Sequence, residues 1–402
     1  MAISTAQKNP AEKLRIIVLG YVVRGPLGGM VWSNLHFLMG LARLGHDVYF
    51  LEDSDDYPSC YDPSKGYTDV DPSYGLSFAA AAFARIGFAE RWGYYDAHRA
   101  LWCGPLAPRA VALCHEADLV LNLCGVNPLR PWLREIPHRA LVDEDPAFTQ
   151  IRHLTENERR DFAVQHNAFF SFGENIASVR CKIPDDGLPW QAARQPVMLD
   201  ALPVTPGKPD APFTTVMQWE SYPGRDYNGQ HYGMKSEAFS PYLQLPGRTG
   251  ARFEIAVGGA EADRTLRQNG WQVRDPFEVS RSPSTYEEFL RSSKGEFSVA
   301  KHGYVVSRSG WFSERSAAYL ASGRPVVIQE TGFSDWLAAD AGVLAFNTPD
   351  EALAGIDAVN SRYDFHCRAA REIAEEYFDA RKVLPPLLER AMSSVTVAHG
   401  SR

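Results

Sequence analysis

The sequence predicts an α/β fold built from two doubly wound domains. In both halves of the chain, short apolar segments of strand length alternate with longer segments of helical periodicity. This alternation is typical of parallel sheets covered by helices. A proline-rich stretch over 183–212 separates the halves and has the composition of a semi-rigid linker. The length of 402 residues fits two domains of ordinary size.

The first half opens with a β-α-β unit. An apolar strand over 15–20 leads into a glycine-rich loop, a helix over about 30–44 that Gly45 ends, and a strand over 46–51. Such a unit favours a parallel sheet, because its two strands run in the same direction. We expect the polar stretch 53–75 to form an extended loop. The other expected elements of this half are helices at 78–88 and 106–116 and strands at 118–123, 139–142 and 168–172.

The second half repeats the same alternation with different residues, so that the two domains are alike in architecture and not in sequence. Strands are expected at 213–219, 253–257, 271–273, 297–300 and 325–328. Helices are expected at 235–243, 262–268, 286–292, 314–322, 350–359, 368–377 and 383–392.

The composition argues against several classes of protein. The formal net charge of -8 does not suit a general nucleic-acid binder, which usually carries a basic surface. The six cysteines are scattered without a Cys-x-x-Cys pair, so we expect neither a zinc site nor a disulfide framework. The N-terminal stretch 1–15 is polar, and no apolar run reaches the roughly 20 residues of a membrane span. We therefore expect a cytoplasmic protein without a transmembrane segment.

Positive residues gather around one predicted helix start in the segment 297–333. Ser313 suits the N-cap of a helix that Gly323 ends. The N-terminus of a helix attracts anions through its free N–H groups and its dipole. We predict a diphosphate site here, the alternative being solvated charge beside an ordinary helix. The residues assigned to it from this segment are Lys301, Arg308, Ser313, Arg315 and Ser316.

The segment 297–333 resembles the donor-diphosphate region of GT-B glycosyltransferases, in which a helix, a small-residue-Gly-x-Pro turn and a buried strand hold the nucleotide-sugar. The stretch 41–48, Leu-Ala-Arg-Leu-Gly-His-Asp-Val, is also similar to an element near the start of many such enzymes. The resemblance implies the GT-B fold, in which two Rossmann-like domains face each other across a cleft. Two acidic positions of the family fall at Gly310 and Ala318, which leaves the nucleotide and the stereochemical outcome open.

The resemblance also implies a second group of cations. In the family, the second domain begins with a strand, a Gly-Arg loop and a lysine that opens the next helix, and these charges neutralise the donor diphosphate. Here the corresponding residues are Gly224, Arg225 and Lys235. The alternative is an ordinary polar loop.

Further residues are predicted to contact the donor sugar or nucleotide. The glycine-rich loop that follows the first strand permits close backbone approach, although it lacks the spacing of a dinucleotide-binding fingerprint. A simple turn is the alternative for that loop. The residues predicted to make these contacts are Gly28, Gly29, His302, Glu314, Thr331, Gly332 and Phe333.

Three carboxylates follow the predicted strand 139–142. The C-terminal ends of parallel strands line ligand sites, so this run should face the cleft. We predict that Asp143 or Asp145 is the general base that deprotonates an acceptor hydroxyl, with helix capping by Asp145 as the alternative. The Asp-x-Asp spelling also matches the metal-binding motif of GT-A glycosyltransferases, and it recurs at Asp53 and Asp55.

These features predict a glycosyltransferase that moves a sugar from a nucleotide diphosphate-sugar to an unidentified acceptor. Cations and a helix dipole, not a metal, would stabilise the leaving diphosphate. No cofactor is expected, since the nucleotide-sugar is a co-substrate. The first domain (1–205) would hold the acceptor, the second (206–367) the donor, and helices over 368–402 would pack back toward the first domain. The alternatives are a GT-B-fold nucleotide-sugar epimerase, a non-catalytic nucleotide-sugar binder and a metal-dependent GT-A enzyme.

Overall fold

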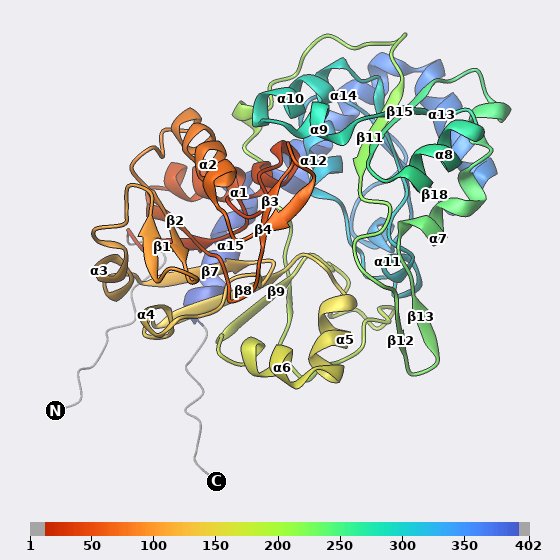
Figure 1. The fold of residues 1–402 in the computed structure, drawn as a ribbon. Helices are drawn as coiled ribbons and strands as arrows, with labels where there is room; N and C mark the ends of the chain where they lie inside the picture. The colour runs from red at the N-terminus through yellow and green to blue at the C-terminus, as the bar shows by residue number, and fades with distance from the viewer. Residues whose placement is uncertain (1–12, 394–402) are drawn as a thin grey trace.

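The computed structural model describes residues 13–393, which form two α/β domains joined by an extended segment (Figure 1). Residues 1–12 of the polar N-terminal stretch, and residues 394–402 of the predicted C-terminal segment, lie outside the described part of the chain.

The first domain is built on a sheet of eight strands in the order β10-β9-β8-β7-β1-β2-β5-β6. Neighbouring strands pair in parallel except β5 and β6. The strands are β1 (Arg15–Leu19), β2 (Asp47–Asp53), β5 (Trp92–Asp96), β6 (Leu101–Cys103), β7 (Leu119–Leu123), β8 (His138–Asp143), β9 (Ala168–Ser171) and β10 (Gln191–Ala192). The helices are α1 (Gly28–Arg43), α2 (Ser73–Arg85), α3 (Ala110–His115), α4 (Pro131–Arg134), α5 (Phe148–Thr155) and α6 (Asn157–Ala163).

Strand β1 lies where the direction of the chain across this sheet reverses. It pairs with β2 on one side and with β7 on the other. Ile16, Ile17 and Val18 are fully buried, as expected for a strand covered on both faces. The loops that follow β1 and β7 leave the sheet in opposite directions. The space between them is a topological switch point, where doubly wound sheets bind ligands.

The second domain is built on six parallel strands in the order β15-β14-β11-β16-β17-β18, with its switch point between β11 and β16. The strands are β11 (Phe213–Met217), β14 (Phe253–Val257), β15 (Gln272–Arg274), β16 (Gly295–Ser298), β17 (Val326–Gln329) and β18 (Val343–Phe346). The α-helices are α7 (Lys235–Phe239), α8 (Ala260–Gln268), α9 (Pro276–Ser280), α10 (Pro283–Ser292), α11 (His302–Val306), α12 (Glu314–Ala321), α13 (Pro349–Ser361), α14 (Tyr363–Ile373) and α15 (Ala380–Ser393). Short 3-10 turns lie at Leu199–Ala201, Ser240–Tyr242, Leu245–Arg248 and Phe333–Asp335.

Two antiparallel hairpins stand outside the large sheets. The first consists of β3 (Cys60–Asp62) and β4 (Tyr67–Asp69), and the second of β12 (Arg225–Tyr227) and β13 (Gln230–Tyr232). The first hairpin lies where we expected an extended loop, and the pair β5–β6 was not expected either. These segments are short, and their strand conformation depends on pairing more than on a local apolar pattern.

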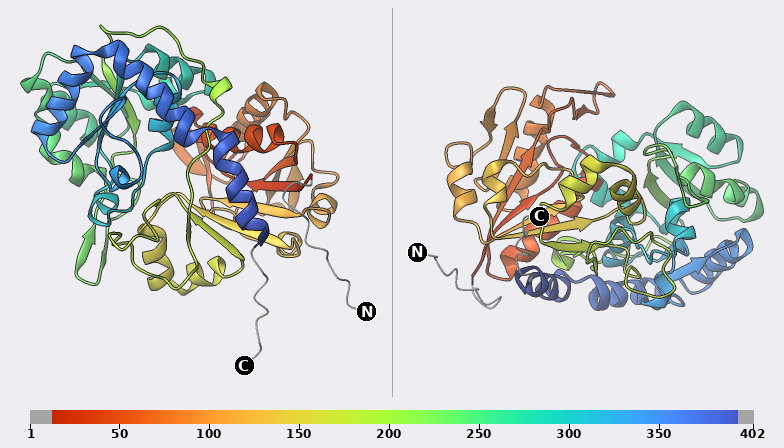
Figure 2. Two further views of the ribbon diagram at one scale, coloured as in Figure 1. Left: turned by 180° about the vertical axis from the view of Figure 1, so that it is seen from behind. Right: turned by 90° about the horizontal axis from the view of Figure 1, so that it is seen from below.

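The C-terminal helices run across the back of both domains (Figure 2). A π-helical segment, Ala374–Phe378, connects α14, which packs on α12 of the second domain, to α15, which packs on α1 of the first. The approach to α1 is close, because a Cβ added at Gly40 would lie 2.5 Å from Leu384 Cδ1. One apolar core therefore continues from the second domain into the first. In the part of the chain that the structure describes, no helix is both long and apolar enough to cross a membrane.

Candidate functional site

The two switch points lie opposite each other between the domains. From the first domain come Cys124, directly after β7, and Glu144, directly after β8. From the second come Lys235, the first residue of α7, and Glu314 and Arg315, which open α12. Glu314 interacts electrostatically with Glu144 across the domains and with Lys235 in its own domain. We call these five residues the switch-point cluster.

Arg315 spans the switch point of the second sheet. Its Nε donates to Glu296 Oε1 on β16 at 2.6 Å, its Nη1 to the carbonyl of Val216 on β11 at 2.9 Å, and its Nη2 to Ser298 Oγ at 2.7 Å. The side chain is buried. These bonds tie β11 to β16 beneath the first turn of α12. Arg315 thus has protein partners at each guanidinium nitrogen where we predicted a phosphate contact, and that contact stays a prediction.

Lys235 is a buried cation of a different kind. The residue is 9% exposed, and no hydrogen bond or ion pair joins its ammonium to another described residue. Burial, together with the positive charges of Arg315 and Lys301, lowers its pKa to about 7. A buried charge without a partner is costly, so an anionic ligand at this position would be stabilised.

Four of the predicted residues meet beside the start of α12. Ser313 is the N-cap, and its Oγ accepts the N–H of Arg315 at 3.2 Å. Next to it lies a cavity of about 10 Å³, the room of about one water molecule. Its lining includes Ser313, Ser316, Thr331 and Phe333.

Two of the predicted phosphate ligands pair with carboxylates elsewhere. Arg225 lies on the β12–β13 hairpin, which reaches toward α5 (Figure 1), and it forms an ion pair with Glu156 of the first domain at 2.7 Å. Arg308 forms an exposed ion pair with Asp335 at 3.2 Å. The structure therefore does not gather these two cations with Lys235.

Asp145 is the centre of a second interdomain group. Its Oδ1 accepts from Lys301 Nζ at 2.9 Å and from the Tyr304 hydroxyl at 2.6 Å. Its Oδ2 accepts from Arg152 Nη2 at 3.0 Å and from the Tyr222 hydroxyl. Only Asp145 and Arg152 belong to the first domain. We call these five residues the polar latch.

The latch explains the protonation state of Asp145. Burial opposes the negative charge, but Lys301, Arg152 and the two hydroxyls outweigh burial and lower the pKa of Asp145 to about 2. A carboxylate that is bound so strongly is a weak base. The geometry favours a docking role for Asp145 over the catalytic role that we predicted.

The other two carboxyls of this run differ from each other. Asp143 is buried and accepts from Ser171 Oγ at 2.7 Å, from Gln150 Nε2 at 3.1 Å and from the N–H of Asp145 at 2.8 Å. Glu144 Oε1 is buried and has no hydrogen-bond partner among the described residues. Burial raises the pKa of Glu144 to about 8, and nearby carboxylates add to the effect.

Gly28 and Gly29 lie where the first domain touches α10 of the second. A Cβ at Gly28 would lie 2.1 Å from the carbonyl oxygen of Ser282, and one at Gly29 would lie 3.1 Å from the ring of Tyr286. Tyr286 interacts electrostatically with Glu314. The glycine-rich loop therefore reaches the edge of the switch-point cluster, and a side chain at Gly28 would push the domains apart.

The remaining predicted contacts are held in place by neighbouring segments. The carbonyl of Gly332 accepts from Asn175 Nδ2 of the first domain at 2.9 Å. The φ of +97° at Gly332 suits glycine. His302 Nδ1 accepts the N–H of Gly233 at 3.2 Å, and its ring lies 5.9 Å from that of His231.

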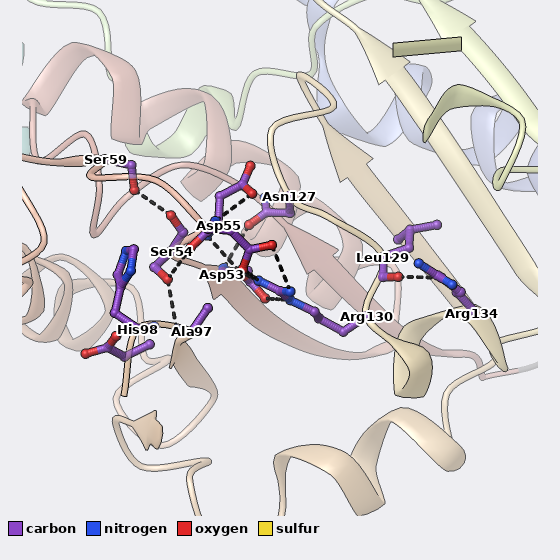
Figure 3. Close-up of polar contacts among 12 residues, drawn as sticks. Asp53, Ser54, Asp55, Ser59, Ala97, His98, Asn127, Leu129, Arg130 and Arg134 are labelled. Carbon is purple, nitrogen blue, oxygen red and sulfur yellow. Dashed lines mark hydrogen bonds and ion pairs between the residues drawn. The ribbon is translucent and has the colours of Figure 1, made fainter. Parts of the chain in front are cut away.

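The two Asp-x-Asp motifs have a local structural role. Asp53 accepts two hydrogen bonds from Arg130, both at 2.9 Å, and its Oδ1 also accepts the N–H of Asp55 at 2.7 Å (Figure 3). Asp143 accepts the N–H of Asp145 in the same way. In both cases the first aspartate stabilises a turn, as Asp side chains commonly do. Within residues 13–393, no group of three or more His, Cys, Asp or Glu side chains is arranged to hold a metal ion.

Sequence reasoning missed the significance of Glu144 and Cys124, and it did not distinguish Lys235 from the other cations. The sequence did contain one signal for these two residues, because Cys124 directly follows β7 and Glu144 directly follows the neighbouring strand β8. Which of three consecutive carboxylates faces the other domain depends on the turn that follows β8, and that turn has no clear local signature. Tyr304 of the latch also gave no signal.

Comparison with known proteins gives matches in structure alone. No protein-family model matches the chain, and no curated protein matches its sequence. An alpha-glucosyltransferase in complex with UDP and a 13-mer DNA containing a central A:G mismatch matches with a TM-score of 0.59 at 11% identity, over 95% of this chain and 100% of that chain. HepE of Anabaena in complex with UDP-glucose matches with a TM-score of 0.57 at 10% identity, over 95% and 100%. AviGT4, a glycosyltransferase involved in avilamycin A biosynthesis, gives 0.51 at 13% identity, over 94% and 97%. The chain has the GT-B fold, as the sequence predicted.

Proposed function

We propose that this chain is a glycosyltransferase that takes a sugar from a nucleotide diphosphate-sugar bound between Lys235 and the start of α12. The observation that carries the proposal is Lys235, a buried residue whose ammonium has no hydrogen bond or ion pair with another described residue. A diphosphate would supply the missing negative charge, and the free N–H groups of the first turn of α12 would bind its oxygens. The similar structures in complex with UDP or UDP-glucose favour UDP as the nucleotide.

The same groups account for a transfer that needs no metal ion. As the bond between the sugar and the phosphate breaks, negative charge develops on the leaving diphosphate. Lys235 and the dipole of α12 would stabilise that charge where it develops. The acceptor would enter from the first domain. The net charge of -8 favours an acceptor other than nucleic acid, although three of the similar alpha-glucosyltransferase structures hold DNA.

The test is calorimetric titration with UDP-, GDP-, ADP- and dTDP-sugars, with and without EDTA. The wild type should bind one nucleotide family equally well in both conditions. Lys235→Met should weaken binding at least about tenfold, because a charge-assisted contact is lost. The matched control is Arg308→Ala, which removes an exposed cation and should change the affinity less than about twofold.

Three outcomes would contradict the proposal. The first is a wild type that binds none of these donors, and the second is a Lys235→Met variant that binds as tightly as the wild type. Conversion of the donor sugar without any acceptor would instead identify an epimerase.

A further inference from the structure

We propose that Glu144 and Glu314 form a two-carboxyl subsite that binds hydroxyl groups of the transferred sugar and disfavours sugars that carry a carboxylate. The inference rests on the proposed function, and it concerns the class of sugar that this site accepts.

The two carboxyls come from opposite domains and meet at the switch points. Glu144 directly follows β8, next to the switch point of the first sheet, and Glu314 is the first residue of α12, next to that of the second. They interact electrostatically with each other, and both interact with Cys124, which is exposed. Solvent therefore reaches this position between the domains.

The proposed diphosphate site adjoins this pair. Glu314 also interacts electrostatically with Lys235, whose ammonium has no hydrogen bond or ion pair within residues 13–393. A sugar attached to a diphosphate at Lys235 would thus lie beside Glu314 and face Glu144.

The protein uses only part of the hydrogen-bonding capacity of the pair, through a contact between Cys124 and Glu144. Glu144 Oε1 has no partner among the described residues, and Glu314 has only a 3.5 Å contact from Ser313 Oγ. A buried carboxyl oxygen without a partner is destabilising, unlike the satisfied oxygens of Asp143 and Asp145. The hydroxyl groups of a sugar both donate and accept hydrogen bonds and would satisfy both carboxyls.

The chemistry of the pair distinguishes neutral from acidic sugars. Burial raises the pKa of Glu144, so that near pH 7 this carboxyl can face the sugar in its protonated form, beside Glu314. Such a pair both donates and accepts hydrogen bonds to hydroxyl groups. A uronic acid would bring a third carboxylate into this space, where like charges repel each other.

The experiment compares the affinities of UDP, UDP-glucose and UDP-glucuronate for the wild type, Glu144→Gln and Glu314→Gln. The wild type should bind UDP-glucose at least about tenfold more tightly than UDP-glucuronate, which is about 1.4 kcal/mol. This preference should shrink at least threefold in Glu314→Gln at pH 7 and in both variants at pH 9, where Glu144 of the wild type is ionised. UDP, which lacks the sugar, gives the reference affinity of each protein. In the wild type the preference should also grow as the pH rises from 7 to 9, because Glu144 ionises. In Glu144→Gln this growth should be absent.

The outcomes separate the two proposals. If UDP binds but the wild type treats the two sugars alike, or if both variants keep the full preference, the subsite is wrong and the donor site stands. If neither UDP nor any UDP-sugar binds, the choice of UDP in the proposed function fails, and the subsite fails with it. Matched melting temperatures in the three proteins would exclude misfolding as the cause of a lost preference.

Discussion

The polar latch and the switch-point cluster both lie between the domains and both contain buried charges, but only the latch is complete. Asp145 accepts four hydrogen bonds there, and Lys301 and Arg152 share it as their anion. In the cluster, Lys235 has no hydrogen bond or ion pair with another described residue, and Glu144 has an oxygen without a hydrogen bond in the same part of the chain. Burial and charge alone therefore do not distinguish the two groups. Residues whose polar atoms have partners within the protein hold the domains together, whereas residues whose polar atoms lack such partners are free to bind a ligand.

Arg315 and Lys235 show the same contrast within one domain. Each is buried, and each was predicted to bind the donor diphosphate. Arg315 donates to three protein acceptors, whereas Lys235 donates to none among the described residues. The following predictions use these contrasts.

The largest expected effect is a loss of stability in Arg315→Met. Removal of the guanidinium leaves Glu296 buried without its cation, which costs about 3–5 kcal/mol of the free energy of unfolding. Chemical denaturation measures this loss. In the double variant Arg315→Met, Glu296→Met most of it should be recovered, since no charge is left stranded. A loss below about 1 kcal/mol in the single variant would show that Arg315 is not needed for stability, and the structural role that distinguishes it from Lys235 would be wrong.

The next effect concerns acid stability and Asp145. A carboxyl whose pKa is lowered on folding stabilises the folded state above its unfolded pKa, and this stabilisation is lost as the pH falls toward the folded pKa. For a change from 3.8 to about 2, the contribution is about 2.5 kcal/mol, lost between about pH 4 and pH 2.

Asp145→Asn tests this contribution. Its free energy of unfolding should fall less steeply than that of the wild type over this range. Asp161→Asn, at an exposed carboxylate of α6, is the matched control and should follow the wild type. Equal slopes in Asp145→Asn and the wild type would show that the latch does not depend on this charge.

A third effect concerns donor affinity above neutral pH. The pKa of Lys235 in the ligand-free protein is about 7, so donor binding above that pH requires uptake of a proton. The affinity for UDP-glucose should then fall by up to about tenfold for each pH unit between 7 and 9. Lys235→Arg keeps its charge over this range, so its affinity for UDP-glucose should change less with pH. Any change that persists in Lys235→Arg comes from other titrating groups. Parallel profiles would mean that Lys235 does not carry the charge that binds the donor.

The smallest effect is expected for Arg225→Ala. Arg225 is partly exposed and pairs with Glu156, and such pairs contribute about 0–1 kcal/mol to stability. Donor affinity should change less than about twofold. A tenfold loss of UDP-glucose affinity, measured by calorimetry, would show that Arg225 contributes to donor binding although it has a protein partner. The contrast between paired and unpaired residues would then not identify the donor site.

Much of the fold was predictable because its signals are local. The strand β1, the helix α1 with its end at Gly45, and the turn at Gly323 before β17 all follow from apolar periodicity and glycine positions. Ser313 is the N-cap of α12 for the same local reason. The β3–β4 hairpin and the pair β5–β6 were missed because their short segments gain strand conformation from pairing with each other.

The positions of some residues of the candidate site were predictable, but their contacts were not. A residue at the C-terminal end of a parallel strand, or directly after it, lies near a switch point, and this holds for Asp143, Glu144 and Asp145 alike. Only one of the three keeps an unpaired buried oxygen. That outcome depends on Ser171, Gln150 and the latch, which lie far away in the chain.

The sequence by itself determined the alternation of strands and helices, the two-domain α/β architecture and the kinds of residue at the ends of the strands, because each depends on neighbours within a few positions. The tertiary structure decided which charges are neutralised. Arg315 finds Glu296 on a neighbouring strand, Asp145 finds Lys301 in the other domain, and Lys235 finds no partner among the described residues. The physical reason is that the cost of a buried charge is set by the groups packed around it, and those groups come together only when the two domains dock.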